Sequence, residues 1–341
     1  MAVTRLAASD EGVRRAGAAL AAGDLVAFPT ETVYGLGADG TNPRAVANIY
    51  RVKGRPADNP LILHVADAAA AEALAREWPD DARRLAERFW PGPLTLVVPA
   101  RAAVPAVVRG GLDTVAVRCP SHPVARRLLA AAGVPVAAPS ANRSGHPSPT
   151  TAEGVARALG GPTTPDVTVW LVDGGPSSIG VESTVVDVSG GRPLLLRPGG
   201  LPTTAIEGVV GALGTPAAGG PARSPGMRYR HYAPDRPLVL LAMDPEAAVA
   251  ALAREGARDR WPKARSGLLA PRRIVEAAGW PAAVSLGDSP HEAAAALFEG
   301  LMTLDRWPGL DRLVAVWNNQ EGVGGAVMDR LERAAAEVVQ A

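Results

Sequence analysis

Two short apolar runs, at 25–28 and 61–65, enclose the stretch that most restricts how this chain can fold. Each run has the length and residue types of a buried strand. Between them lie two hydroxyl side chains, Thr30 and Thr32, three closely spaced glycines and the cationic cluster 53–55. A hydrophobic core has no need of such residues. The pattern therefore predicts a ligand-binding site between two strands of one domain.

Strand and helix signals alternate along the first 212 residues. One helix begins at the capping residue Ser9 and runs to 22, and a second begins at Pro43 and ends near 51. Further helices are expected at 67–76, 80–88, 121–132, 150–159 and 203–211, and further strands at 94–98, 114–118, 134–138, 168–172, 183–188 and 193–196. Because several strands follow one another directly, we predict an α/β domain with a mixed sheet.

The last third of the chain repeats this alternation more regularly. Residues 214–225 are rich in Gly, Pro and Ala, which is typical of a linker. Beyond them, strands are expected at 238–242, 266–269, 282–286 and 312–317, and helices at 245–255, 290–304 and 326–339. We predict a smaller Rossmann-like α/β domain with a mostly parallel sheet. The expected organisation is a domain at 1–212, a linker at 213–236 and a domain at 237–341.

Composition narrows the possible functions of the 341 residues. The net charge of +1 gives no general case for nucleic acid as the main partner. A single cysteine, Cys119, cannot form an internal disulfide, which suits a reducing compartment. No apolar run approaches the roughly 18 residues of a membrane span, and the N-terminus shows no export signal. We expect a cytoplasmic protein that does not enter the membrane.

The glycines at 35, 37 and 40 fit the dinucleotide pattern G-x-G-x-x-G. That motif requires its last glycine inside a helix, whereas here the helix begins only at Pro43. We therefore interpret these glycines as a tight turn. The chain also has no P-loop, and no Cys/His cluster or H-E-x-x-H pattern indicates a metal site.

Lys53 and Arg55 stand out because Lys53 and Lys263 are the only lysines among 35 cations. A compact ammonium and a forked guanidinium on one loop can hold phosphate oxygens from two sides. Alternatively, the two residues satisfy carbonyls at the end of the preceding helix. His64, in an apolar strand, fits a core residue equally well, and Arg118 fits either a surface cation or a carboxylate clamp.

Several motifs together resemble the YrdC-like family of L-threonylcarbamoyladenylate synthases, in its long two-domain form. The resemblance rests on 29–37 (PTETVYGLG), 53–56 (KGRP), 59–61 (NPL), 140–145 (SANRSG), 182–185 (ESTV), 197–199 (RPG) and 224–234 (SPGMRYRHYAP). It covers residues 1 to about 235 with specific motifs, and the remainder only by length and position. It implies a twisted mixed-sheet YrdC-like domain followed by a smaller Rossmann-like domain.

The resemblance also implies a set of site residues. Those matching positions that hold threonine are Thr32, His64, Arg118, Ala138 and Ser183. Those matching nucleotide contacts are Lys53, Arg55, Asn59, Thr114, Ser140, Ser148, Arg197 and Tyr232. Lys53 and Arg55 are expected to act in catalysis, with no metal ligand from the protein. Arg228 stands where many relatives have lysine, which leaves its own role open.

The reaction implied is the synthesis of threonylcarbamoyl-AMP and pyrophosphate from L-threonine, bicarbonate or CO2, and ATP. Mg2+ is expected to enter with ATP, held mainly by phosphates and water. A separate transferase is expected to pass the product to adenosine 37 of tRNA, so tRNA is only an indirect partner. The block 224–234 is expected to close over the site as a lid.

Two other functions are weighed against this one. An RNA-binding or ribosome-maturation protein is disfavoured because residues 1–212 are nearly balanced in charge and hold no RNA-binding motif. Carbamoyl transfer is disfavoured because the acylphosphatase and zinc-finger modules of such enzymes are not found in the sequence.

Overall fold

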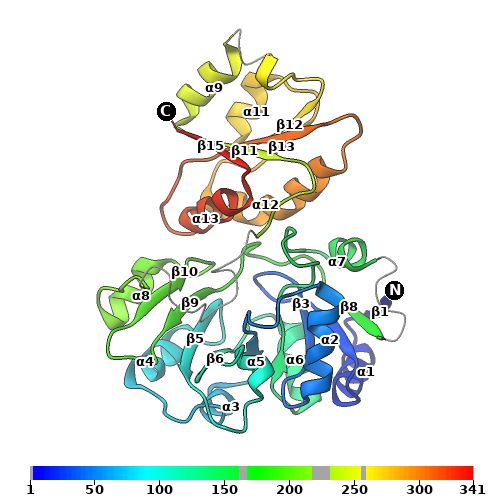
Figure 1. The fold of residues 1–341 in the computed structure, drawn as a ribbon, viewed down its shortest axis with the longest axis vertical. Coiled ribbons are helices and arrows are strands. Elements are labelled where there is room, and N and C mark those ends of the chain that lie inside the picture. Colours follow the sequence, from blue (N-terminus) through cyan, green and yellow to red (C-terminus); the bar gives the residue numbers. More distant parts are fainter. Residues whose placement is uncertain (1–2, 161–166, 217–230, 255–258, 341) are drawn as a thin grey trace. The chain divides into compact units, whose positions relative to one another are not determined.

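A computed structural model describes residues 3–160, 167–216, 231–254 and 259–340. These residues form two compact units, each with its own sheet. No helix within these ranges is long and apolar enough to cross a membrane. The fold agrees with the predicted pair of α/β units, the first with a mixed sheet and the second with a parallel one (Figure 1).

The first unit contains a ten-stranded sheet in the order β1-β8-β2-β3-β7-β4-β6-β5-β9-β10. Its strands are β1 (Val3–Ala7), β2 (Leu25–Phe28), β3 (Gly35–Asp39), β4 (Ile62–His64), β5 (Leu94–Pro99), β6 (Thr114–Arg118), β7 (Val136–Ala137), β8 (Val169–Asp173), β9 (Thr184–Asp187) and β10 (Leu194–Arg197). Its helices are α1 (Asp10–Ala21), α2 (Pro43–Lys53), α3 (Ala68–Glu72), α4 (Asp80–Phe89), α5 (Ala106–Arg109), α6 (Pro123–Ala132), α7 (Ala152–Leu159) and α8 (Thr203–Val210).

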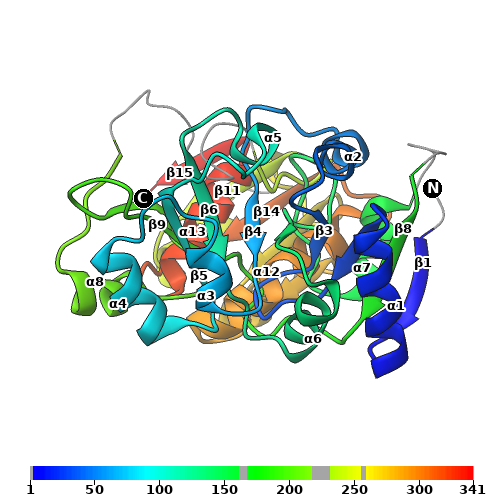
Figure 2. The ribbon, with the colours of Figure 1, turned by 90° about the horizontal axis from the view of Figure 1, so that it is seen from below.

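Two apolar clusters cover different parts of this sheet. The larger one joins strand residues to α2, α4 and α7, and a second joins α1 and α6 to the strands at the β1 end. Figure 2 shows α2 and α5 on one side of β3 and β4, with α1 and α6 on the other. A third, small cluster consists of strand residues only: Ile62, Val97, Ala116, Val185 and Leu196. This strand-only patch forms the floor on which the polar residues of the candidate site are arranged.

Local sequence explains where α2 begins and ends, and therefore where its last side chains lie. The side chain of Asn42 accepts from the backbone N–H groups of Arg44 and Ala45, and Pro43 occupies the first turn. Gly54 ends the helix at φ 61°, a left-handed conformation that glycine adopts without strain. The helix therefore continues two residues beyond the predicted end near 51, and Lys53 lies in its last turn.

The glycines at 35 and 37 do not form the tight turn predicted from the sequence. They belong to β3, which pairs antiparallel with β2, with Val26 opposite Gly37 and Phe28 opposite Gly35. A Cβ atom on Gly37 would lie 2.7 Å from Val136 Cγ1 and 2.9 Å from Phe28 Cε1. Glycine is present here because neighbouring side chains fill the space above the strand.

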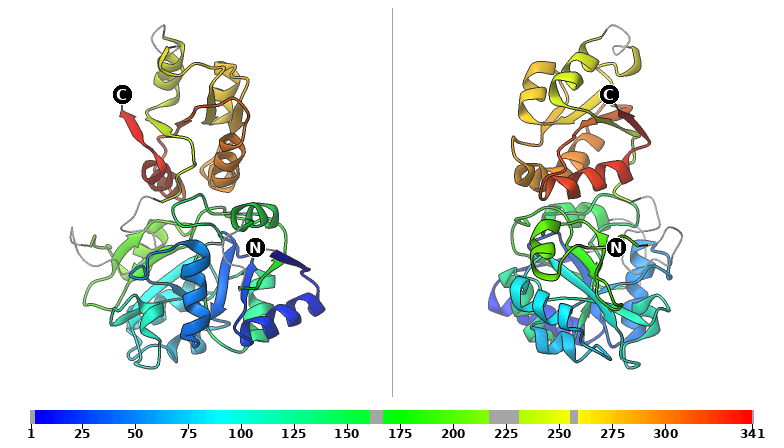
Figure 3. Two further views of the ribbon diagram at one scale, coloured as in Figure 1. Left: turned by 45° about the vertical axis from the view of Figure 1, so that its right-hand side comes forward. Right: turned by 90° about the vertical axis from the view of Figure 1, so that its left-hand side faces the viewer.

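The second unit is a five-stranded parallel sheet in the order β13-β12-β14-β11-β15. Its strands are β11 (Leu238–Ala242), β12 (Ser266–Ala270), β13 (Ala283–Ser285), β14 (Arg312–Val316) and β15 (Glu337–Gln340). Its helices are α9 (Pro245–Ala253), α11 (Arg272–Ala278), α12 (Pro290–Asp305) and α13 (Gly324–Ala334). Figures 1 and 3 show α9 and α11 on one face of this sheet and α12 and α13 on the other.

The sequence analysis did not predict the short helices α5 and α11, and three further differences from the prediction involve β pairing. The helix expected at 67–76 ends at Glu72, because the chain turns so that Ala75 can pair with Ala100. The helix expected at 326–339 ends at Ala334, and residues 337–340 form β15 beside β11. Strand β1, which the sequence analysis did not predict, pairs with β8 in register. Each difference reflects a partner that is distant in sequence.

The second unit also includes two short segments, Gly145–Ser148 and Ile179–Val181, which interrupt the part of the chain that forms the first unit. The backbone N–H of Ala233 donates to the carbonyl of Gly145 at 2.8 Å. The Nδ1 atom of His146 lies 3.7 Å from Asp235 Oδ1. Most of the predicted linker, and all of the predicted lid except residues 231–234, lie outside the described residues.

The crowding around β3 yields a stability prediction. Gly37→Ala should lower the free energy of unfolding by about 1–3 kcal/mol, because the added methyl group meets Val136 and Phe28 in a packed core. Gly208→Ala is the matched control, since a Cβ on this exposed residue of α8 meets nothing within 4 Å. It should stabilise by up to about 1 kcal/mol. Urea unfolding that ranks Gly37→Ala at or above the wild type would contradict this account.

Candidate active site

Strand alternation places two of the predicted threonine-binding side chains, His64 and Arg118, on the face that carries the strand-only patch. In β6, Val115 and Val117 belong to the large core, so Thr114 and Arg118 lie on the opposite face with Ala116. In β4, His64 shares the face of Ile62 in the same way. The parallel register of β4 and β6 sets His64 beside Arg118. An apolar patch is thus bordered by polar side chains.

Arg118 is the centre of a buried polar cluster. Its Nη1 atom donates to Thr32 Oγ1 at 2.9 Å, and its Nη2 atom lies 2.7 Å from Glu31 Oε1. Its Nε atom donates to the carbonyl of Gly92 at 3.3 Å. Because Arg118 is only 3% exposed, it is not the surface cation that the sequence left open as an alternative. The structure fixes its guanidinium group by three contacts from two separate chain segments, the loop of Glu31 and Thr32 and the carbonyl of Gly92.

Glu31 is part of this cluster, although the sequence analysis assigned it no role. Burial opposes the charged form of its carboxyl group, but the charge of Arg118 and a hydrogen bond to it outweigh this effect, so the pKa of Glu31 is lowered. The carboxylate is therefore ionised near neutral pH. A glutamate between two threonines in a loop offers no sequence signal for such pairing, which depends on a strand more than 80 residues further along the chain.

The loop that carries Glu31 and Thr32 is held by its own hydroxyl groups. Thr30 Oγ1 lies 2.8 Å from Thr32 Oγ1 and donates to the carbonyl of Val33 at 2.6 Å. The backbone N–H groups of Thr32 and Val33 both lie 3.2 Å from the same Thr30 oxygen. Thr30 therefore fixes the turn that presents Thr32 to Arg118, an ST-turn type of arrangement.

His64 is buried and uncharged. Burial, reinforced by the nearby positive charge of Arg118, lowers its pKa to about 3. Its ring packs edge-on against Phe28, with ring centroids 6.2 Å apart. Its Nδ1 atom has no hydrogen-bond partner among the described residues. His64 thus combines the core position considered from the sequence with a polar atom that a ligand can use.

Lys53 and Arg55 donate to main-chain carbonyls of neighbouring loops. The Nζ atom of Lys53 donates to the carbonyl of Ser140 at 2.6 Å and to that of Asn142. Arg55 donates from Nε to the carbonyl of Asn59 at 3.2 Å and from Nη2 to that of Pro60 at 3.0 Å. None of these four carbonyls belongs to α2. The alternative interpretation, in which the two cations satisfy carbonyls at the end of that helix, is therefore not what these bonds show.

The ammonium group of Lys53 is strongly affected by its surroundings. Burial, followed by the positive charge of Arg55, lowers the pKa of Lys53 well below its ordinary value, while Glu182 acts in the opposite direction. A buried cation of this kind gains from a bound anion. The environment of Lys53 therefore suits a residue that acts on a phosphate.

Ser183 and Arg197 form a second polar group at the other side of the patch. Arg197 donates to the carbonyl of Ser183 from Nη2 at 2.9 Å and from Nε at 3.2 Å. Its Nη2 atom also lies 3.2 Å from Ser183 Oγ, which in turn lies 2.8 Å from Thr95 Oγ1. Thr95 is another residue to which the sequence analysis gave no role.

The other predicted residues are less directly connected. Asn59 is buried, and its carbonyl accepts from both Arg55 and Tyr50. Thr114 begins β6, and the backbone N–H of Ala138 donates to the carbonyl of Ile62. Ser148 and Tyr232 belong to the second unit. There, the Tyr232 ring packs on Phe298 at 5.4 Å, and the Arg330 guanidinium carbon lies 5.3 Å from its centre.

The geometry groups the predicted residues into three clusters in the first unit. Thr32 and His64 adjoin Arg118, Lys53 holds the loop of Ser140, and Arg197 holds Ser183. These clusters offer cations, hydroxyl groups and one neutral imidazole. Among the described residues, no group of three or more His, Cys, Asp or Glu side chains is placed to hold a metal ion. Side chains of this kind are better suited to binding anionic substrates than to attacking a substrate as a nucleophile.

Fold and site together define an α/β protein with a cation- and hydroxyl-rich binding unit and a Rossmann-like C-terminal unit. Comparison with known proteins specifies it further. A family model for the Sua5/YciO/YrdC family, described as telomere recombination, matches residues 18–199. A second, described as the C-terminal domain of threonylcarbamoyl-AMP synthase, matches residues 202–336. The chain belongs to the threonylcarbamoyl-AMP synthase family.

Relatives from distant organisms match almost the whole chain. A threonylcarbamoyl-AMP synthase of Pyrococcus abyssi is 44% identical over 336 residues, covering 94% of this chain and 93% of its own length. A threonylcarbamoyl-AMP synthase of Bacillus subtilis is 42% identical over 339 residues, covering 97% of this chain and 94% of its own length. The crystal structure of P. abyssi Sua5 complexed with L-threonine has a TM-score of 0.92 at 40% identity and covers all of both chains.

The buried imidazole yields a pH prediction. The unfolded chain takes up a proton on His64 near pH 6.5, whereas the folded protein does so only near pH 3. The contribution of neutral His64 to the free energy of unfolding is therefore fully present above pH 6.5 and is lost as the pH falls toward 3. Between pH 7 and pH 5 this loss should amount to about 2 kcal/mol. His64→Gln should remove this component from the pH dependence of urea unfolding.

The matched control is His291→Gln, which replaces an exposed histidine of α12. It should keep the wild-type dependence on pH. If His64→Gln and the wild type lose stability in parallel between pH 7 and pH 5, the imidazole is not buried as a neutral group.

Proposed function

We propose that this protein synthesises threonylcarbamoyl-AMP from L-threonine, bicarbonate or CO2, and ATP, releasing pyrophosphate. The observation that carries the proposal is the buried guanidinium of Arg118, fixed between Glu31 and Thr32 and next to neutral His64. It has the chemistry to recognise a small amino acid, and a full-length structural relative is described as complexed with L-threonine.

The threonine half of the proposed site comprises Thr32, His64, Arg118, Ala138 and Ser183. Arg118 would face the substrate carboxylate, for which its planar fork is well suited. Glu31 already balances part of its charge, so a zwitterionic amino acid adds no net charge to the cluster. His64, being neutral, would contribute a hydrogen bond and no further charge.

The nucleotide half comprises Lys53, Arg55, Asn59, Thr114, Ser140, Ser148, Arg197 and Tyr232. Lys53 and Arg55 would stabilise the charge that develops on the phosphates during transfer, and these are the proposed catalytic residues. Burial of an ammonium already held between two carbonyls supports this assignment. Mg2+ would accompany ATP and lower the charge of its phosphates, held mainly by phosphate oxygens and water.

The proposed reaction has two steps. The threonine ammonium first loses a proton to solvent, and its nitrogen then attacks the carbon of CO2 with release of a second proton, or of bicarbonate with loss of water, and forms a carbamate. A carbamate oxygen then attacks the α-phosphorus of ATP, and the bond from that phosphorus to the oxygen bridging the β-phosphate breaks. Pyrophosphate leaves with the bond electrons. Positioning and charge stabilisation can account for such a transfer without a protein nucleophile.

We propose the cytoplasm as the place of this reaction, supported by one buried, unpaired cysteine, Cys119. The mixed anhydride product requires an acceptor. A separate transferase would pass the threonylcarbamoyl group to adenosine 37 of tRNA, which makes tRNA an indirect partner.

Pyrophosphate release tests the reaction directly. With ATP and Mg2+ present, release should require L-threonine and bicarbonate together, since the carbamate is the attacking group. Equal release after CO2 has been stripped from the assay would rule out the carbamate step. RNA binding that persists at physiological salt, with no ATP turnover, would favour an RNA-binding function.

Substitution of the two lysines tests the role assigned to Lys53. Lys53→Arg should lower kcat/KM about 10- to 150-fold, the equivalent of about 1.5–3 kcal/mol for one charge-assisted contact. A planar guanidinium cannot replace a compact ammonium between the Ser140 and Asn142 carbonyls. Lys263→Arg is the control, because this lysine is exposed in the second unit. Wild-type kcat/KM in Lys53→Arg, with normal unfolding, would show that the ammonium is dispensable.

A further inference from the structure

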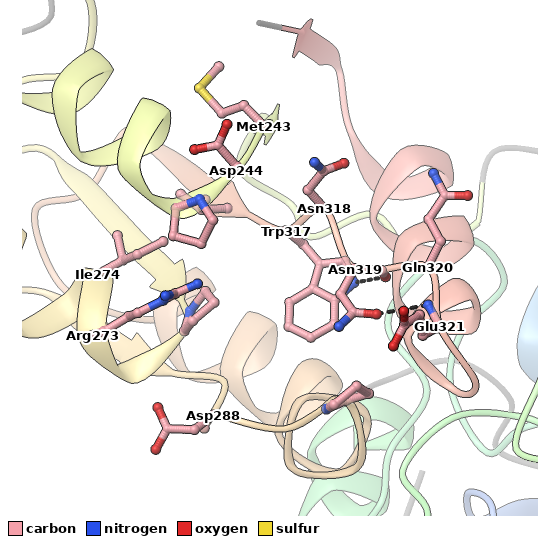
Figure 4. A pocket seen from close by; sticks show the side chains of 15 residues that line it. Met243, Asp244, Arg273, Ile274, Asp288, Trp317, Asn318, Asn319, Gln320 and Glu321 are labelled. Carbon is pink, nitrogen blue, oxygen red and sulfur yellow. Dashed lines mark hydrogen bonds between the residues drawn. The ribbon is translucent and has the colours of Figure 1, made fainter.

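The second unit contains a cavity of about 630 Å³ at the carboxyl edge of its parallel sheet (Figure 4). Residues that directly follow four strands line it: Met243 after β11, Pro271 after β12, Gly287 shortly after β13, and Trp317 after β14. This volume lies within the range of pockets that hold small organic molecules. Neither the threonine nor the nucleotide residues proposed above line this cavity.

The topology explains why a cavity forms at this edge. The chain leaves β11 and β12 toward α9 and α11 on one face, and leaves β13 and β14 toward α12 and α13 on the other. Neighbouring strands in the order β13-β12-β14-β11 therefore send their connections to opposite faces. Open α/β sheets bind ligands in the crevice that such divergence creates.

The floor of the cavity is apolar and rigidly held. Its buried side chains come from the ends of β11 and β14 and from α11: Met243, Val316, Trp317 and Ile274. The indole Nε1 atom of Trp317 donates to the carbonyls of Asn319 at 2.9 Å and Gly324 at 3.2 Å. The polar atom of the ring is thus already satisfied, and what remains for a ligand is its aromatic surface.

The rim is polar, exposed and acidic. It carries three carboxylates, from Asp244, Asp288 and Glu321, and one cation, Arg273. The charge of Asp288 is balanced in part by Arg272, whose Nε atom lies 3.2 Å away. The remaining negative charge favours a ligand that carries a positive group. Figure 4 shows the three carboxylates and Arg273 around the Trp317 ring.

The same edge is poorly suited to phosphate. A Rossmann-type nucleotide site places a pyrophosphate at the N-terminus of the first helix, after a glycine-rich turn. Here that position is occupied by the carboxylate of Asp244, which accepts from the backbone N–H of Ala247 at 2.9 Å. The start of α12 is likewise closed by its own capping box of Ser289 and Glu292.

We propose that this cavity binds a small organic amine. The ammonium group lies at the acidic rim, against Asp288 or Glu321, and the apolar body lies over Trp317 and Ile274. This site is separate from the proposed synthase reaction and does not depend on it.

Calorimetric titration of the full-length chain tests this site. The probes are tyramine, an aromatic amine, spermidine, a linear amine, and tyrosol, in which a hydroxyl replaces the ammonium of tyramine. At least one amine should bind, and tyrosol should bind more weakly than tyramine. The double variant Asp288→Asn/Glu321→Gln should weaken amine binding by up to about tenfold, as expected for exposed charges.

The matched control is Glu246→Gln/Glu276→Gln, which removes two exposed carboxylates outside the cavity and should bind like the wild type. Three outcomes would overturn the proposal. They are an absence of amine binding at millimolar concentration, equal weakening in both double variants, and tyrosol binding as tightly as tyramine. Competition of AMP with the bound amine would also contradict it, because the rim is expected to exclude phosphate.

Discussion

The buried ion pair between Arg118 and Glu31 is the interaction on which the site of the first unit depends. It joins the last residue of β6 to a loop that follows β2, and Thr32 Oγ1 of the same loop accepts a further hydrogen bond from Arg118. Two charges withdrawn from water cost several kcal/mol each, and only close pairing with additional hydrogen bonds offsets this. The loop is therefore fixed in one place, because any other position would leave one charge buried and alone.

Other cations of the first unit act on the backbone in a related way. Lys53, Arg55 and Arg197 each donate to carbonyl groups of loops that border the strand-only patch. Buried carbonyl groups of a loop need hydrogen-bond donors. These side chains supply the donors where no helix or strand does so. Positive charge is in this way already concentrated and ordered before a ligand arrives. Electrostatic stabilisation by pre-arranged groups of this kind costs little reorganisation when charge develops.

The two units present opposite electrostatic surroundings. The first unit gathers buried cations around hydroxyl groups, whereas the cavity of the second has an aromatic floor beneath an acidic rim. The candidate active site of the first unit and the cavity of the second unit both lie where strands end and the chain leaves the sheet. Ligand sites in α/β proteins commonly form at such positions. The charge of the side chains decides which ligand class each can accept. Because its rim is acidic, we expect the cavity of the second unit not to duplicate nucleotide binding.

The sequence by itself determined most of the helices and strands, the mixed and parallel character of the two sheets, and, through family motifs, the grouping of Thr32, His64 and Arg118. Tertiary structure alone decided that the 35–39 segment is a strand, that Glu31 pairs with Arg118, and that two short segments from the middle of the chain belong to the second unit. The physical reason is common to all three. A short strand, a buried charge and a docking loop are each stabilised by partners far along the chain, and local sequence carries no record of those partners.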